Sequence, residues 1–182
     1  MKLNKLLLIP LLTTALIACD NPAKVKSSPE MFAANFAFTA CVRHAGEGEK
    51  LTALFNKSGI NQLPDKLADS FLKGESGKAW SFTSPDGQFA ITYKTDGVCT
   101  VFIKQTDADL FIAETNKVMK RISQKVGWSF SPDSIPNFAG STTLESFTVS
   151  GKSKDSKNVN ITLSATHAKS GSYQVALSTN VI

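Results

Sequence analysis

The sequence predicts an α+β fold in which N-terminal helices pack on an antiparallel three-stranded meander, followed by a long amphipathic helix and three further antiparallel strands. Apolar residues recur at helical spacing over residues 29–74 and 106–127, and at every second position in the stretches that follow each of them. Short polar turns join the predicted strands, which favours antiparallel pairing over parallel βαβ units. Twelve phenylalanines and two tryptophans among 182 residues supply bulky side chains for a core.

The first 18 residues have the pattern of a bacterial lipoprotein signal peptide. Two lysines precede the apolar run of residues 6–18. A helix of that length reaches about 20 Å and falls short of the roughly 30 Å hydrocarbon core, so the run is too short for a comfortable transmembrane span. It ends in Leu16-Ile17-Ala18-Cys19, which resembles the lipobox of lipoprotein precursors. That resemblance implies cleavage after Ala18 and acylation of Cys19 by diacylglycerol on its sulfur and a chain such as palmitate on its amino group.

Acylation of Cys19 would fasten the mature chain to a membrane. Residues 19–28 form the lipidated tether, and its nine residues after Cys19 span at most about 30 Å when extended. The single domain expected over residues 29–182 would face the periplasm of a Gram-negative cell envelope. Asp20 favours the inner membrane in some bacterial lineages but not in others, so either membrane fits. An ordinary cleaved signal that ends near a cysteine is the alternative.

Three helices are expected at the start of this domain. Ser28-Pro29 marks the first, because serine caps free amides and proline fits the first turn; the helix ends near Gly46. The second ends at Gly59, and the third lies between Pro64 and Gly74. Their apolar positions, expected to pack in the core, include Met31, Phe32, Ala34, Phe36, Phe38, Cys41, Val42, Leu51, Leu54, Phe55, Leu67, Ala68, Phe71 and Leu72.

Residues 80–103 alternate between apolar and polar side chains, which predicts a meander of three strands. Turns are expected at Pro85-Asp86-Gly87 and Asp96-Gly97. The side chains expected to share the core-facing side are Trp80, Phe82, Phe89, Ile91, Tyr93, Cys99, Val101 and Ile103.

A long helix is expected next, because Thr106-Asp107-Ala108-Asp109 resembles a capping box and Gly127 marks the end. Its apolar stripe is expected to comprise Leu110, Phe111, Val118, Ile122 and Val126.

The chain after this helix is expected to begin with an irregular connector over residues 129–141, since two prolines and a glycine interrupt it. The connector separates possible halves at 29–128 and 142–182. Three strands follow, with apolar positions in residues 147–149, 159–165 and 173–177. No sequence repeat relates them to the first meander, so a duplication would rest on topology alone.

The expected compartment determines the state of the other two cysteines. Thiols outside the cytoplasm are oxidised, and acylation of Cys19 leaves only Cys41 and Cys99. A disulfide between them is therefore predicted. A reactive thiol and half of a metal site are the alternatives, although neither cysteine belongs to a C-x-x-C motif.

A family resemblance extends over residues 36–125. Residues 71–80, 87–90 and 96–102, which include Gly97-Val98-Cys99, resemble a family of small uncharacterised Gram-negative envelope proteins and lipoproteins. The resemblance implies a secreted or lipid-anchored domain with a paired cysteine and no assigned activity. It brings no catalytic residues with it.

No complete catalytic set is recognisable in the sequence. Ser70-Phe71-Leu72-Lys73 matches the S-x-x-K pattern of penicillin-recognising enzymes, but no S-D-N is present and Lys94-Thr95-Asp96-Gly97 only approximates K-T-G. A solvated serine and lysine are therefore favoured. His44 and His167, the only histidines, are expected at the surface, with a catalytic or zinc-binding pair as the alternative. No cofactor or metal is predicted. A cell-wall-active enzyme or accessory is one alternative function.

The long helix carries a cationic stripe away from its apolar side, formed by Lys117, Lys120, Arg121 and Lys125. Near a bilayer these cations could contact anionic headgroups, and simple solvation is the alternative. A structural protein that contacts phospholipid or lipopolysaccharide is thus a further function class.

The features together favour a non-enzymatic binding or inhibitor-like module whose partner is another envelope protein or a secreted protein. Removal of two lysines with the signal peptide lowers the formal charge from +5 to +3, because 20 − 2 basic residues then face 15 acidic ones. That charge is too small to indicate nucleic-acid binding. No oligomeric state is predicted.

Overall fold

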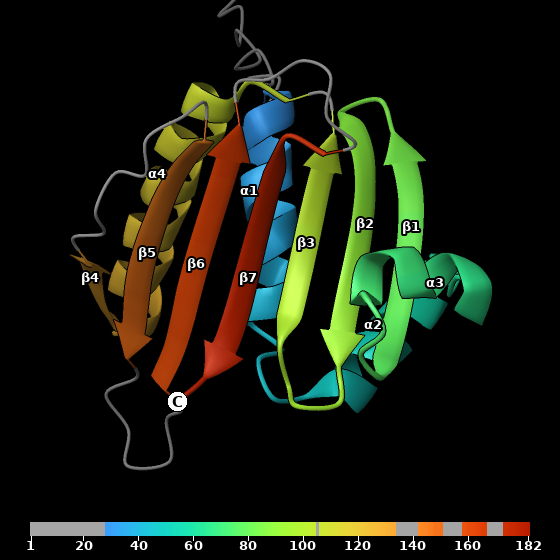
Figure 1. Cartoon of the computed structure of the whole chain (residues 1–182). Helices are drawn as coiled ribbons and strands as arrows, with labels where there is room; N and C mark the ends of the chain where they lie inside the picture. The colour runs from blue at the N-terminus through green and yellow to red at the C-terminus, as the bar shows by residue number, and fades with distance from the viewer. Residues whose placement is uncertain (1–27, 105, 134–141, 151–157, 167–172) are drawn as a thin grey trace, which may run out of the picture.

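Helices and strands are segregated in an α+β architecture, as predicted, with an antiparallel sheet as its centre (Figure 1). The computed structural model describes residues 28–104, 106–133, 142–150, 158–166 and 173–182. The predicted signal peptide, Cys19 and the tether up to residue 27 lie outside the described residues, as does His167. Within the described part, no helix combines the length and apolar character needed to cross a bilayer.

The sheet has seven strands in the order β1-β2-β3-β7-β6-β5-β4, and every neighbouring pair is antiparallel. Strands β3 and β7 join the first meander to the last strands, with Val101 opposite Leu177. The strand bounds are β1 Gly77–Ser84, β2 Gly87–Lys94, β3 Cys99–Lys104, β4 Ser129–Asp133, β5 Thr142–Ser150, β6 Asn158–Thr166 and β7 Val175–Val181.

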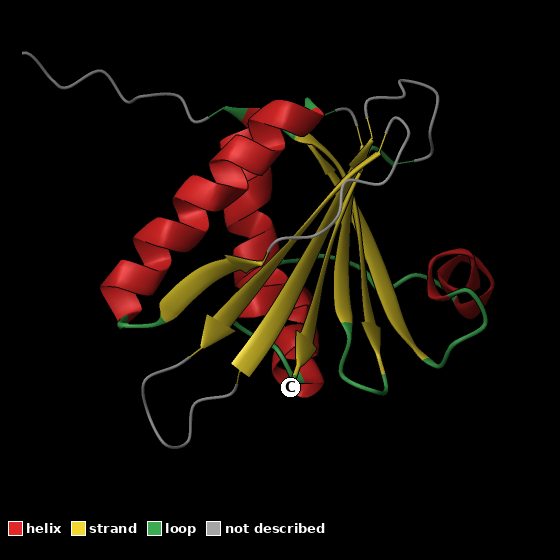
Figure 2. Ribbon diagram, turned by 60° about the vertical axis from the view of Figure 1, so that its left-hand side comes forward, coloured by secondary structure: helices red, strands yellow, loops and turns green. Residues whose placement is uncertain are grey.

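The helices lie on both faces of the sheet (Figure 2). Helices α1 and α4 pack against each other on one face, and α2 joins them there through contacts of its Phe55 with Phe36 and Trp80. Helix α3 lies on the opposite face, over β1 and β2 (Figure 1). The helix bounds are α1 Pro29–Ala37, α2 Gly48–Lys57, α3 Asp65–Leu72 and α4 Ala108–Val126, with a π-helical turn, η1, at Phe38–Val42.

The main core lies between the sheet and α1, α2 and α4. Alternate residues of β6 and β7 are buried, as the period of two requires, and the first meander contributes Trp80, Phe89 and Ile103 to the same layer. Phe36 of α1 packs against Phe82 and Phe89, with ring centroids 4.9 and 5.3 Å away. The predicted core side of the first meander is confirmed, although Phe82 and Tyr93 are only partly buried.

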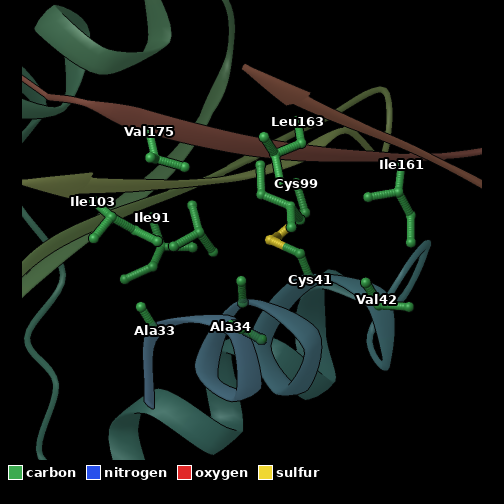
Figure 3. Close-up of a cluster of buried hydrophobic side chains, with 14 of the residues drawn as sticks. Ala33, Ala34, Cys41, Val42, Ile91, Cys99, Ile103, Ile161, Leu163 and Val175 are labelled. Atoms are coloured by element: carbon green, nitrogen blue, oxygen red, sulfur yellow. A yellow bond between two sulfur atoms is a disulfide. The ribbon is translucent and has the colours of Figure 1, made fainter. Parts of the chain in front are cut away.

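The predicted disulfide is confirmed between Cys41 of η1 and Cys99 of β3, both of which are buried among apolar side chains (Figure 3). It joins the helix layer to a central strand of the sheet. The Thr179 hydroxyl lies 3.5 Å from the carbonyl oxygens of both cysteines and donates to them. The alternatives of a reactive thiol and a metal ligand are therefore wrong for these two residues.

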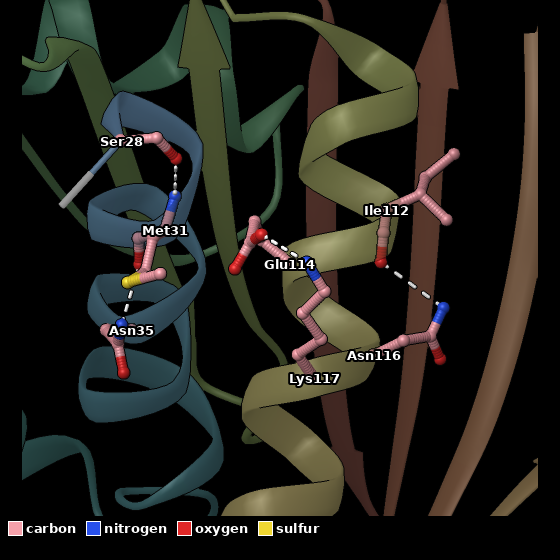
Figure 4. A network of polar contacts seen from close by, with 7 residues as sticks. All are labelled: Ser28, Met31, Asn35, Ile112, Glu114, Asn116 and Lys117. Carbon is pink, nitrogen blue, oxygen red and sulfur yellow. Dashed lines mark hydrogen bonds and ion pairs between the residues drawn. The ribbon is translucent and has the colours of Figure 1, made fainter.

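Two helix starts follow from their capping residues. The Ser28 hydroxyl accepts from the Met31 amide at 3.1 Å, as predicted (Figure 4). At α4 the capping residue is Asp107, whose carboxylate accepts from the Leu110 amide at 3.0 Å. The helix therefore begins one residue later than a cap at Thr106 would place it, because aspartate at this position satisfies a free amide equally well.

Several sequence-based expectations need correction. Residues 129–133 of the predicted irregular connector form β4, so four strands rather than three follow α4. Leu67 and Leu110, predicted to face the core, are 56% and 54% exposed. The next residue along each helix is buried instead: Ala68 follows Leu67, and Phe111 follows Leu110. These two side chains lie on the packed face of their helices.

The topology has an approximate internal twofold arrangement. Helix α1 precedes the meander β1-β2-β3, and helix α4 precedes β4 and the meander β5-β6-β7. The last strands of the two meanders, β3 and β7, pair antiparallel at the middle of the sheet, and the two helices pack together beneath them (Figure 1). The possible halves of the sequence thus contribute to one continuous sheet.

Candidate functional site

One face of the sheet, called the open face here, lies opposite α1, α2 and α4 and carries only α3 among the described helices (Figure 2). Short polar side chains occupy much of it. A row of register partners, Thr92, Thr100, Ser178 and Thr162, crosses four strands from β2 to β6. The hydroxyls of Thr100 and Ser178 are 2.9 Å apart and hydrogen bonded. Thr92 and Thr100 are buried, so the partly exposed hydroxyls of this row are those of Ser178 and Thr162, on strands about 4.8 Å apart.

A groove of about 510 Å³ lies where α3 meets the open face. Its volume is within the range of ligand pockets, about 300–1,000 Å³. Helix α3 and the residues after it form one wall, and the ends of β3, β6 and β7 form the floor and the other wall. The lining residues are Ser70, Phe71, Lys73, Phe102, Ser164, Thr166, Tyr173, Gln174, Val175 and Ala176.

Three aromatic rings give the groove its apolar surface. Phe71 of α3 lies 5.8 Å from Phe102 of β3 and 5.6 Å from Tyr173, measured between ring centroids, and Phe102 lies 5.7 Å from Tyr173. All three side chains are partly exposed. Burial raises the pKa of the Tyr173 hydroxyl, so this group stays protonated at neutral pH and can donate a hydrogen bond.

Local packing holds α3 in this position. Ala68 and Leu72 are buried with Ala79 of β1 in a small second core on the open face, and Leu63 packs against it. The Leu63 amide donates to the Ala79 carbonyl at 2.8 Å, which ties the segment before α3 to the edge strand. Phe71 follows Ala68 by three residues, so the same face of α3 that packs on the sheet directs this ring toward Phe102.

Lys73 ends α3 in the left-handed conformation, with φ of 54°. It is the only non-glycine residue with positive φ in the described part of the chain. A residue with a Cβ pays roughly 1 kcal/mol or more for this conformation, which glycine adopts freely. Lys73 is exposed, lines the groove and has no ion pair with any described residue. Among the described residues, the groove lining therefore contains one ammonium group and no carboxylate.

Lys73→Gly is expected to raise the free energy of unfolding by about 1 kcal/mol, since glycine removes the strain of the left-handed conformation. The matched control is Lys120→Gly, an exposed lysine within α4, which is expected to lower the same quantity by about 1 kcal/mol. Urea denaturation of both variants measures the difference. Equal destabilisation by the two substitutions would contradict the assignment of strain to Lys73.

The S-x-x-K pair lies at this groove without forming a catalytic arrangement. Ser70 and Lys73 both line it, but the Ser70 hydroxyl donates to the Leu67 carbonyl at 2.7 Å. A carbonyl oxygen cannot take up the proton of a nucleophilic serine. No hydrogen bond joins Ser70 to Lys73 in the described structure.

His44 is partly buried rather than fully at the surface, and its Nδ1 is buried without a hydrogen-bond partner. Burial, followed by the charge of Arg43, lowers the pKa of this histidine, which favours the neutral ring at neutral pH. Its predicted companion, His167, lies outside the described residues. In the part of the chain that is described, no three histidine, cysteine, aspartate or glutamate side chains gather as a metal site would require.

All four residues of the cationic stripe on α4 are exposed, namely Lys117, Lys120, Arg121 and Lys125. Lys117 is engaged by Glu114, with its Nζ 2.8 Å from the carboxylate (Figure 4). The stripe lies on the helical side of the sheet, away from the groove. Contact of these residues with anionic headgroups stays a prediction.

A second hollow of about 530 Å³ lies between the start of α2 and the ends of β1 and β2. The Tyr93 ring packs so closely on Gly48 that a Cβ there would lie 2.5 Å from it. The hollow mixes Glu49 with Lys78 and Lys94, and Lys94 already pairs with Glu75 at 2.9 Å. This mixture of charges favours neither an anionic nor a cationic ligand, whereas the described charge at the groove is the positive one of Lys73.

Comparison with protein-family models, with curated proteins and with solved structures found no match to this chain. Apart from Ser70 and Lys73 of the S-x-x-K pattern, sequence reasoning did not single out the groove residues as a site. One signal was present in Phe102, a large aromatic residue that alternates with the core residues Val101 and Ile103 and so must point away from the core.

Proposed function

We propose that this chain is a lipid-anchored, periplasm-facing envelope protein that acts as a non-enzymatic binding or inhibitor-like module through the groove on its open face. The observation that carries the binding role is the cluster of three partly exposed aromatic rings at a groove with hydroxyl and amide neighbours. Apolar surface with a few polar groups is typical of ligand sites.

The proposed location has support from the Cys41–Cys99 disulfide. Disulfides persist in oxidising compartments and are rare in the cytoplasm. The lipobox-like Leu16-Ile17-Ala18-Cys19 supplies the proposed anchor, since two acyl chains already hold a protein stably at a bilayer. The family resemblance of residues 36–125 agrees with an envelope protein and remains part of this proposal.

The binding role is favoured over hydrolysis by the geometry at Ser70. A nucleophilic serine needs a general base within hydrogen-bond reach, and its hydroxyl instead bonds a backbone carbonyl. The groove residues that are described supply recognition chemistry: apolar rings, hydroxyls and the ammonium group of Lys73.

A photo-crosslinking amino acid at Ser164, in the groove, tests the proposal in intact envelopes. We expect a discrete adduct from this position, and none at the matched position Ala113, which is exposed on α4 on the other side of the sheet. Ala176→Trp should suppress the Ser164 adduct, because the indole would fill the groove floor. Thermal unfolding verifies that this variant stays folded. Absence of an adduct at Ser164, or an identical pattern from Ala113, would contradict binding through the groove.

A further inference from the structure

The groove combines three features that together restrict its ligand, and this inference rests on the binding role proposed above. We infer that the groove binds a saccharide unit that carries a carboxylate, with the pyranose ring on the aromatic cluster and the carboxylate beside Lys73. The shape of the aromatic cluster, the polar lining and the charge each support a different part of this assignment.

The aromatic rings suit the apolar face of a sugar ring. A pyranose exposes C–H groups on its faces, and aromatic side chains pack on such surfaces through their negative ring faces. The three rings also contact one another, with centroids 5.6–5.8 Å apart and planes tilted by 49–66°. They leave no room between them for a quaternary ammonium group, so an aromatic cage for a cation is excluded.

The remaining lining suits the hydroxyls of a sugar. Ser164 and Ala176 are register partners on the floor, and Ser70 lies on the α3 wall with an oxygen that can still accept a hydrogen bond. Beyond the groove, the hydroxyl row continues along the open face through Ser178 and Thr162. A ligand longer than one sugar would therefore find further hydroxyls along its path.

The charge of the groove selects the acidic sugar. Among the ten lining residues that the structure describes, Lys73 is the sole charged one. An anionic group beside it gains a charge-assisted hydrogen bond without facing a carboxylate among the described lining residues. Glycine at position 73 would adopt the left-handed conformation with less strain. Lys73 therefore places a charge at the groove although its backbone is strained there.

A matched pair of disaccharides tests this inference. N-acetylglucosaminyl-N-acetylmuramic acid and di-N-acetylchitobiose share their ring framework and differ by the lactyl ether group, which carries the carboxylate. Titration calorimetry with the full protein in detergent micelles should give an affinity about tenfold higher for the acidic sugar, as expected for one hydrogen bond between charged groups. Lys73→Gly should remove that difference. Lys66→Gln, an exposed lysine of α3 outside the groove lining, should preserve it.

Phenylacetate serves as a third probe, because it has a ring and a carboxylate but no hydroxyls. Tighter binding of phenylacetate than of either sugar would overturn the saccharide assignment, as would no binding of any probe. Equal affinity for the two sugars, or a difference that survives in Lys73→Gly, would overturn the role of the carboxylate. A Ser164 adduct in native envelopes, together with no binding of either sugar, would overturn this inference alone. If neither the adduct nor sugar binding is observed, the binding role itself is overturned as well.

Discussion

Replacement of Cys41 and Cys99 together by alanine is expected to lower the free energy of unfolding by about 4 kcal/mol. The bond closes a loop with a sequence separation of 58 residues, and without it the unfolded chain regains the entropy of that loop. The effect should be large because both sulfurs are buried where the helix layer meets the sheet (Figure 3). Urea denaturation of the oxidised protein and of the double variant measures the difference.

Two controls separate the covalent bond from the loss of sulfur atoms. Wild-type protein unfolded in the presence of a reductant should approach the stability of the alanine pair. Substitution of Ala33, a buried residue of the same core, by glycine removes a side chain without opening any loop and should cost less, about 1 kcal/mol. Equal stability of the wild type and the double variant would contradict a stabilising role for the disulfide.

Substitution of Cys19 by alanine is expected to abolish lipid attachment altogether. The proposed acyl chains attach at the sulfur and the amino group of this residue, and burial of each CH₂ contributes about 0.8 kcal/mol to membrane binding. Metabolic labelling with a palmitate analogue should therefore mark the wild type and leave the variant unlabelled. Asp20→Ala is the matched control, which should retain the label while allowing a change of membrane. Label in the Cys19→Ala protein would contradict acylation at this residue.

Sequence reasoning succeeded where local patterns decide structure. The period of two over residues 80–103 predicted the first meander and its core side, and the buried position of Cys99 followed from it. The cysteine count and the proposed compartment predicted the disulfide. These features depend on residues that are close in sequence or on simple pairing, so no knowledge of the whole fold was needed.

Strand β4 was missed because its sequence lacks the usual strand signals. Pro132 lies within it, and proline cannot donate to a ladder. The strand is at the edge of the sheet and pairs only with β5, so the missing amide can be tolerated there. The polar residues Ser129, Ser131 and Asp133 completed the resemblance to a loop.

The groove could not be predicted because it depends on which face of the sheet α3 covers. Phe71, Phe102 and Tyr173 come from a helix, a strand and the residues before another strand, and no local pattern brings them together. Helical periodicity assigned Phe71 to the apolar side of its helix. It does not indicate that this side packs on the sheet face opposite α1. The crossing of α3 to the open face is set by tertiary contacts of Ala68, Leu72 and Ala79.

Intact-mass analysis of the protein purified from membranes tests the central proposal most directly. We predict a chain that begins at Cys19, carries the mass of its acyl groups, and shows no free thiol when treated with an alkylating reagent before reduction. After reduction, Cys41 and Cys99 should take up two alkyl groups. An unacylated start, or alkylation of both later cysteines without reduction, would contradict a lipid-anchored protein of the oxidising envelope.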